Sequence, residues 1–171
     1  MENQWDDHEN TKGTITLMNI DCSPHTLYTV TCWRDGALLW TETFPNLVTT
    51  AGKNKLLDAT FKTGLAAPAW YIGIINNAGF TAYNVADTMA SHAGWVEGTP
   101  YSEAVRQTFT PGTIASASVD NSASNAVFTI NFGQTVQGTF LVDNNTKGGA
   151  TGTLYGMGAF SALRVLLPAD V

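Results

Sequence analysis

Two short alternating runs joined by Asp35-Gly36 limit the folds open to this chain more than any other feature. Residues 27–33 and residues 37–44 both alternate apolar and polar side chains, which is the pattern of a half-buried strand. Asp-Gly between two such runs favours the tight turn of a β-hairpin. The sequence therefore predicts an antiparallel hairpin over residues 27–44.

Other runs with strand character follow along the chain. Residues 70–75 are continuously apolar, which predicts a strand buried on both faces, and residues 80–85 could extend it or pair with it. Further strands are expected at residues 13–20, 113–119, 126–132, 135–142 and 151–162. Many short strands separated by Gly, Asn and Pro predict a mainly β domain, an antiparallel β-sandwich or a barrel-like, jelly-roll-like fold.

One short helix is expected after the hairpin. Thr49-Thr50 stands just before residues 51–61, in which Leu56 and Phe61 fall at helical spacing. A Thr cap before such a pattern predicts the start of a helix, and Gly64 is a typical stop.

The length and composition predict one domain. A chain of 171 residues can bury a substantial core, and 44% of the residues are apolar while only 13% are charged. Residues 1–13 are polar and predict a flexible N-terminal arm, so residues 14–171 form a single β-rich domain. Trp5 is either part of a free tail or an anchor that reaches a neighbouring subunit.

The charge and hydropathy exclude two classes of partner. The formal net charge is −6, so we expect no broad basic surface for nucleic acid. No apolar run reaches the length of a membrane span, and residues 1–12 lack the features of a secretory signal. We therefore expect no nucleic acid and no membrane as partners, with synthesis in a cytoplasm. There Cys22 and Cys32 stay reduced, whereas an oxidising setting could join them in a disulfide.

Asp87, Ser91 and His92 form the one cluster that suggests catalysis. A hydrolase needs a nucleophile, a base and an acid within hydrogen-bond reach, but adjacent Ser and His on a regular element point apart. Capping by Asp87 and Ser91 on a single helical turn, with His92 packed or at the surface, is the simpler interpretation. No zinc, calcium or nucleotide motif is present, so we expect no catalytic residue, no metal and no cofactor.

Two further regions are candidates for contacts with other proteins. Trp95 and Tyr101 lie in a connection rich in Gly and Pro, where they belong either to the core or to a binding surface. Residues 163–171 are largely apolar and include Leu166 and Leu167. Such a segment either pairs into a sheet or packs against another subunit.

The order of motifs along the chain resembles a family of small virion proteins of tailed bacteriophages and prophages that are encoded among the head genes. The likeness runs from about residue 30 to residue 162. It is carried by Trp40-Thr-Glu-Thr-Phe-Pro-Asn-Leu-Val48, Gly52-Lys-Asn, Leu56-Leu-Asp58, residues 70–75, Ala86-Asp-Thr-Met-Ala-Ser-His-Ala-Gly-Trp95, Tyr101-Ser, Arg106, Asn145-Thr-Lys and Thr151-Gly-Thr-Leu-Tyr155. Residues 86–95 are the most specific part.

The resemblance implies a non-enzymatic capsid decoration or cement protein. Such a protein binds the outside of the head, bridges major capsid protein subunits and is present in several copies that contact one another. Its expected location is the virion surface, after synthesis in the cytoplasm of a bacterial host. The inter-subunit contacts expected here are Trp5, Trp95, Tyr101, Leu166 and Leu167. The alternatives are a tail or host-recognition component that binds a glycan through Trp95 or Tyr101, and a small hydrolase.

Overall fold

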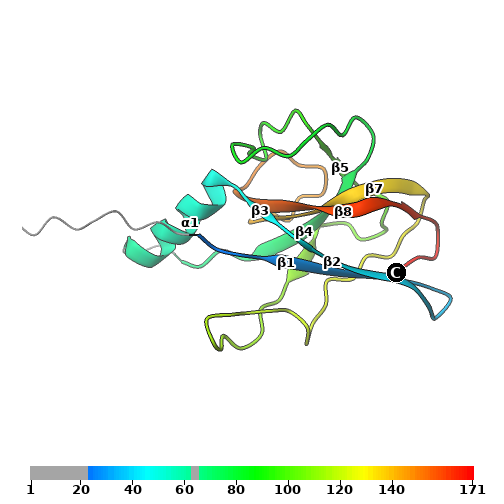
Figure 1. Cartoon of the computed structure of the whole chain (residues 1–171), viewed down its shortest axis with the longest axis horizontal. Helices are drawn as coiled ribbons and strands as arrows, with labels where there is room; N and C mark the ends of the chain where they lie inside the picture. The colour runs from blue at the N-terminus through cyan, green and yellow to red at the C-terminus, as the bar shows by residue number, and fades with distance from the viewer. Residues whose placement is uncertain (1–22, 63–65) are drawn as a thin grey trace, which may run out of the picture.

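The computed structural model describes residues 23–62 and 66–171, and these residues form a mainly β fold with one short helix (Figure 1). The elements are β1 (Leu27–Arg34), β2 (Ala37–Pro45), β3 (Leu47–Val48), α1 (Thr50–Phe61), β4 (Trp70–Asn76), β5 (Val96–Gly98), β6 (Gln107–Phe109), β7 (Gln134–Val142) and β8 (Leu154–Leu166). The predicted strand at residues 13–20, the N-terminal arm with Trp5, and Cys22 lie outside the described residues.

The predicted hairpin is confirmed as a separate two-stranded sheet. β1 pairs with β2 in antiparallel register, from Leu27 opposite Pro45 to Arg34 opposite Ala37. Asp35 and Gly36 have φ angles of 49° and 77°, the positive values that the tight turn requires.

The other strands form a second, six-stranded sheet. Its strand order is β3-β8-β7-β4-β5. β5 pairs with residues 74–76 of β4, and β6 pairs with residues 70–72 of β4. Every pairing in this sheet is antiparallel. The sheet is open, so the sandwich prediction is confirmed and the barrel-like alternative is wrong.

Both faces of the large sheet are covered. One core lies between this sheet and the hairpin and contains Tyr28, Cys32 and Phe44 from the hairpin. A second core, around Trp95 and Phe140, lies on the opposite face, under the segment that connects β4 to β5. Neighbouring residues of β4 therefore point into different cores, as predicted for a strand buried on both faces.

The helix begins where the Thr cap predicted. Thr49 is the N-cap, and its hydroxyl oxygen accepts a hydrogen bond from the N–H of Gly52 at 2.9 Å. The same hydroxyl donates to the carbonyl oxygen of Leu154 at 2.5 Å, so the cap also ties the helix to β8. Gly52 is needed at this point, because a Cβ there would overlap the backbone of Tyr155.

Three sequence predictions fail in the connections between strands. Residues 113–119 form a projecting loop with a reverse turn at Ser116 and Ala117, whose φ angles are 50° and 58°. Residues 80–85 are not a strand, and residues 87–92 form a turn instead of a helical turn. Small, uncharged residues alternate in the projecting loop, but the loop has no neighbouring strand with which to pair.

Residues 126–132 are extended without being part of a sheet. Their backbone bonds go to connecting segments: Ile130 N–H donates to the carbonyl oxygen of Asp170 at 2.9 Å, and Asn131 N–H donates to that of Pro100 at 2.8 Å. The alternation holds over residues 127–130, because Phe128 and Ile130 pack in the first core while Val127 is exposed. It ends at Phe132, which the same pattern would bury but which is exposed. A period of two thus identified extended backbone but not its partner.

Within the described residues, no helix is long and apolar enough to cross a membrane.

The first testable prediction concerns Gly138, at the contact between β7 and β8. An added Cβ would overlap the backbone oxygen of Gly158 and the hydroxyl of Tyr83, so Gly138→Ala should destabilise the fold by about 1–3 kcal/mol. Urea unfolding measures this change in the free energy of unfolding. Gly133→Ala is the matched control, because its Cβ would meet only ordinary contacts at 3.6 Å. Equal stability of the two variants would contradict the close approach.

Candidate functional site

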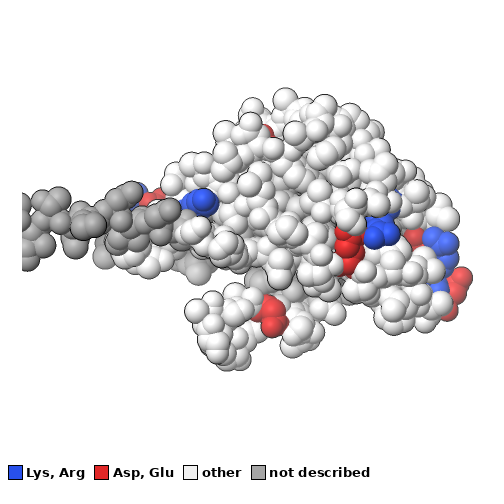
Figure 2. Space-filling model, viewed as in Figure 1, with Lys and Arg blue, Asp and Glu red and all other residues white. Residues whose placement is uncertain are grey.

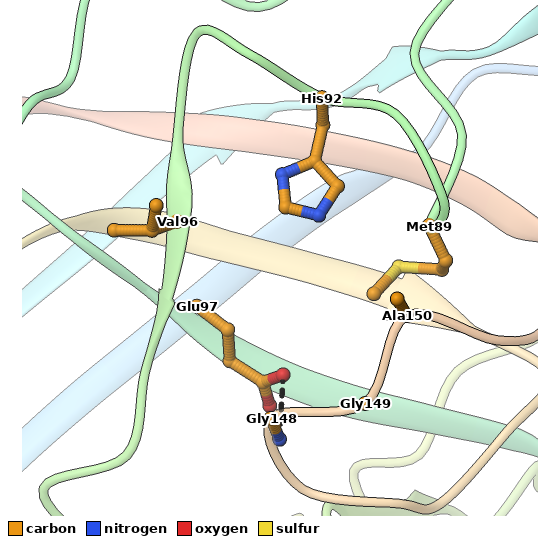
Figure 3. A pocket seen from close by; sticks show the side chains of 7 residues that line it. All are labelled: Met89, His92, Val96, Glu97, Gly148, Gly149 and Ala150. Atoms are coloured by element: carbon orange, nitrogen blue, oxygen red, sulfur yellow. Dashed lines mark hydrogen bonds between the residues drawn. The ribbon is translucent and has the colours of Figure 1, made fainter.

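One pocket of about 250 Å³ lies beside the second core. It is lined by Met89, His92, Val96, Glu97, Gly148, Gly149 and Ala150. Figure 3 shows the imidazole of His92 on one wall and the carboxylate of Glu97 on another, next to the turn at residues 148–150. The pocket therefore brings together two titratable side chains from the same part of the chain.

The Glu97 carboxylate is held by three donors. Its Oε1 accepts from Nε of Arg106 at 3.0 Å, and its Oε2 accepts from Nη2 of Arg106 at 2.8 Å. The backbone N–H of Gly148 donates to Oε2 at 2.9 Å, as Figure 3 shows. This carboxylate orients the turn and neutralises a buried cation, and it is not placed as a proton donor or acceptor for a substrate.

Arg106 is buried and connects several segments. Besides the pair with Glu97, Nη1 donates to the carbonyl oxygen of Asn144 at 2.8 Å and Nη2 donates to that of Gly149 at 2.7 Å. The guanidinium lies 5.2 Å from the centre of the Phe140 ring. A buried guanidinium is tolerated only when its donors are satisfied, so this residue fixes the loop around it.

Lys147 fastens the same loop from the other side. Its Nζ donates to the carbonyl oxygens of Tyr101 at 3.0 Å and Glu103 at 2.7 Å, and it lies 4.5 Å from the centre of the Tyr101 ring. The sequence predicts an exposed loop at residues 144–149, and several of its residues are exposed. Its backbone is nevertheless anchored by two cations.

Asp87 serves the packing of Trp95. Its Oδ2 accepts from Nε1 of Trp95 at 3.0 Å and from the backbone N–H of Asn84 at 3.0 Å. The carboxylate therefore satisfies the polar edge of an otherwise buried indole. This contact also closes the turn that begins at Asn84.

His92 stacks on the Trp95 ring, with 4.0 Å between the ring centres. Nδ1 of His92 donates to the carbonyl oxygen of Trp95 at 2.8 Å, because a carbonyl oxygen can only accept. Ser91 is exposed, and its backbone N–H and carbonyl pair with Thr88. Among the described residues no hydrogen bond links Ser91 to His92 or His92 to Asp87, so the geometry of a catalytic triad is not formed there.

The described residues also contain no group of three or more His, Cys, Asp or Glu side chains arranged to hold a metal ion.

Three of the predicted contact residues are wrong as surface contacts. Trp95 and Tyr101 are each 1% exposed and Leu166 is 7% exposed, so these side chains are used within the core. Trp95 packs in the second core because the connection after β4 folds over that face of the large sheet, whereas Tyr101 and Leu166, the last residue of β8, pack in the first core. Leu167 is 42% exposed and stays a candidate, while Trp5 lies outside the described residues.

The C-terminal residues pair with the hairpin, which is one of the two outcomes that the sequence left open. The backbones of Trp33 and Val171 exchange two hydrogen bonds, of 2.8 and 2.9 Å. Asp170 is buried and accepts from Nε and Nη2 of Arg34 at 2.6 and 3.0 Å. We call residues 167–171 the C-terminal strap.

Cys32 lies beside this strap in the first core, in agreement with its predicted role as core filling. Burial, together with the negative charge of Asp170, raises the pKa of the Cys32 thiol to about 11. The thiol is therefore protonated at neutral pH, which makes it a poor nucleophile.

Sequence reasoning missed the residues that hold the loops together. Arg106, Lys147 and Glu42 enter the sequence analysis only within the motifs of the resemblance, and Asp170 is given no role there. Glu42 accepts from Nη2 of Arg164 at 2.5 Å and so joins β2 to β8. The scarcity of charge is the signal that could have indicated these roles. A chain with only 8 Lys and Arg residues has few cations to leave at the surface.

Comparison of the chain with models of protein families found no match, and neither the curated proteins nor the solved structures contain one.

The Glu97–Arg106 pair gives the second prediction. Glu97→Gln keeps the shape of the side chain but leaves a buried guanidinium without its counter-charge, so it should destabilise the fold by about 3–5 kcal/mol. Asp58→Asn removes the same charge from the exposed pair with Lys62 and should cost at most about 1 kcal/mol. Denaturant unfolding compares the two, and similar losses would mean that Arg106 does not depend on Glu97.

The third prediction concerns pH and the strap. The hydrogen bond from Arg34 lowers the pKa of the Asp170 carboxyl, so the charged form stabilises the folded state. This stability is present above the ordinary Asp pKa of about 3.9 and is lost as the pH falls through the lower folded value. Asp170→Asn should therefore be less stable than the wild type at neutral pH, with a difference that shrinks in acid. A difference that is constant with pH would exclude the ionised carboxylate as its cause.

Proposed function

We propose that this chain is a non-enzymatic structural protein of a tailed-phage virion, which binds the outside of the head and stabilises the major capsid protein subunits. The motif order along residues 30–162 supports this class of protein. The observation that carries the proposal is the use of charged side chains. Arg106 and Lys147 both hold the loop at residues 144–149 in place.

A protein that acts by adding contacts between coat subunits needs a rigid body and a surface that does not repel its neighbours. The large sheet is covered on both faces. Buried or partly buried ion pairs hold the loop at residues 144–149, the C-terminal strap and the hairpin in place. Figure 2 shows wide areas without charged side chains on one face, with most charges gathered toward the end that carries the hairpin tip. These features support a structural role.

The stabilising effect of such a protein comes from the interface area that each copy adds and from the number of bound copies. Each bound copy adds an interface that must break before the shell can open, and binding to the assembled shell alone shifts the equilibrium towards it. Many symmetric copies convert a modest affinity at one contact into a large collective effect.

The two alternative functions draw less support from the site. A glycan-binding surface was expected at Trp95 and Tyr101, whose rings are buried and so cannot stack on a sugar. A hydrolase was expected at Ser91 and His92, where His92 stacks on Trp95 and Ser91 belongs to a turn. His92 does line the pocket, but its Nδ1 donates to the carbonyl oxygen of Trp95, and among the described residues no hydrogen bond links it to Ser91.

The fourth prediction tests the proposed function. In purified virions of the phage that encodes this chain, its copy number should stand in a simple ratio to the major capsid protein, because decoration follows the symmetry of the shell. Quantitative mass spectrometry with labelled peptides of both proteins measures the ratio. A handful of copies per particle would favour a tail component, and absence from virions would reject both structural locations.

A further inference from the structure

The outward face of the hairpin carries no charged side chain. Between its ends it presents four exposed threonines, two on each strand. Thr29 lies opposite Thr43 and Thr31 lies opposite Thr41, with hydroxyl oxygens 2.9 and 3.2 Å apart. The charged residue in the middle of β2, Glu42, instead faces the interior and pairs with Arg164. This leaves a flat, neutral strip on a chain whose net charge is −6.

β1 is an edge strand along most of its length. The N–H and carbonyl groups of successive residues in β1 point alternately toward β2 and toward the outer edge. Because Trp33 exchanges two hydrogen bonds with Val171, the backbone groups of the odd-numbered residues are those that point to the outer edge. Among the described residues, no strand continues this pairing to Leu27, Thr29 and Thr31. Three N–H and three carbonyl groups are therefore presented in a row, next to a position that already accepts a strand.

This edge lacks the usual protection against pairing. Natural edge strands carry Lys, Pro, a bulge or an inward charge that keeps other strands away. Leu27, Thr29 and Thr31 are exposed and uncharged, and Leu27 is 67% exposed. The register shift in the hairpin lies farther along, between Cys32 and Trp33, where Val171 already covers the edge.

We propose that the outer edge of β1 pairs with the same edge of a second copy of this chain, antiparallel and about a two-fold axis. With Thr29 on the axis, Leu27 of each copy lies opposite Thr31 of the other. The three outward residues of each strand then form three hydrogen-bonded pairs. The C-terminal strap limits the ladder to this length, because Val171 occupies the position at Trp33.

Charge favours this edge over other surfaces as the place where two copies meet. Two molecules of net charge −6 repel each other over most orientations, and like charges directly opposite destabilise a strand pair. The proposed edge brings no carboxylate opposite a carboxylate. Among the described residues, the charged groups of Arg34 with Asp170 and of Glu42 with Arg164 are paired within each copy. A short ladder of this kind gives a weak, concentration-dependent dimer, and the inference does not depend on the virion role.

The fifth prediction tests the edge with two matched variants. Thr29→Lys/Thr31→Lys places two ammonium groups on β1, while Thr41→Lys/Thr43→Lys places them on the same face of β2, whose own outer edge is protected by Pro45 and the inward Glu42. Both variants change the net charge equally and break the same two threonine contacts. Sedimentation velocity over a wide concentration range should show a reversible dimer for the wild type. The β1 variant should weaken this dimer about tenfold or more, and the β2 variant much less.

Hydrogen exchange of the wild type provides an independent measurement. The amides of Leu27, Thr29 and Thr31 should become protected from exchange as the protein concentration rises. The protection of the β1 amides that bond to β2 should not change. A wild type that stays monomeric at every concentration overturns the proposal. Equal weakening by both variants, or a dimer without protection of these amides, also overturns it, because association then uses another surface. Melting temperatures of both variants verify that each is folded.

Discussion

The arrangement of this fold depends on one buried guanidinium. Arg106 has five N–H donors in a fixed plane, and burial requires that they find acceptors. The structure supplies the carboxylate of Glu97 from β5 and carbonyl oxygens from the loop at residues 144–149. Removal of Glu97 would leave a buried charge without its counter-charge, and removal of the loop would leave N–H donors of Arg106 without acceptors. The side chain therefore couples β5, the start of β6 and the loop after β7 into one unit.

Other ion pairs follow the same logic between segments that lie far apart in the sequence. Glu42 and Arg164 connect the two sheets, and Arg34 and Asp170 hold the C-terminal strap against the hairpin. Exposed ion pairs contribute little to stability, but pairs that are partly buried between distant segments select one arrangement over others. In a chain with 13% charged residues, the charges thus specify how neutral layers are placed together.

The sequence predicted the regular elements well, because their patterns are local. The hairpin follows from alternation around Asp35-Gly36, and the helix follows from the Thr49 cap. It failed where long-range partners decide: residues 126–132 alternate as a strand does, yet their backbone bonds to the connections at Pro100 and Asp170. The positions of Trp95 and Tyr101 failed for the same reason, since flanking Gly and Pro indicate a connection but not the face that it covers.

The segment at residues 86–95 shows why a motif can be specific without being a binding site. Asp87 holds the indole of Trp95, His92 stacks on that indole, and Met89 fills the core below them. Gly94 is required because a Cβ there would overlap the backbone oxygen of Ala82. These positions of the string are thus constrained by their neighbours within the cover of the sheet, whereas Ala86, Ala90, Ser91 and Ala93 are exposed. The side chains that hold this segment in place are not free to contact a partner, so a partner's contacts have to be sought on other surfaces, where the side chains are exposed and neutral.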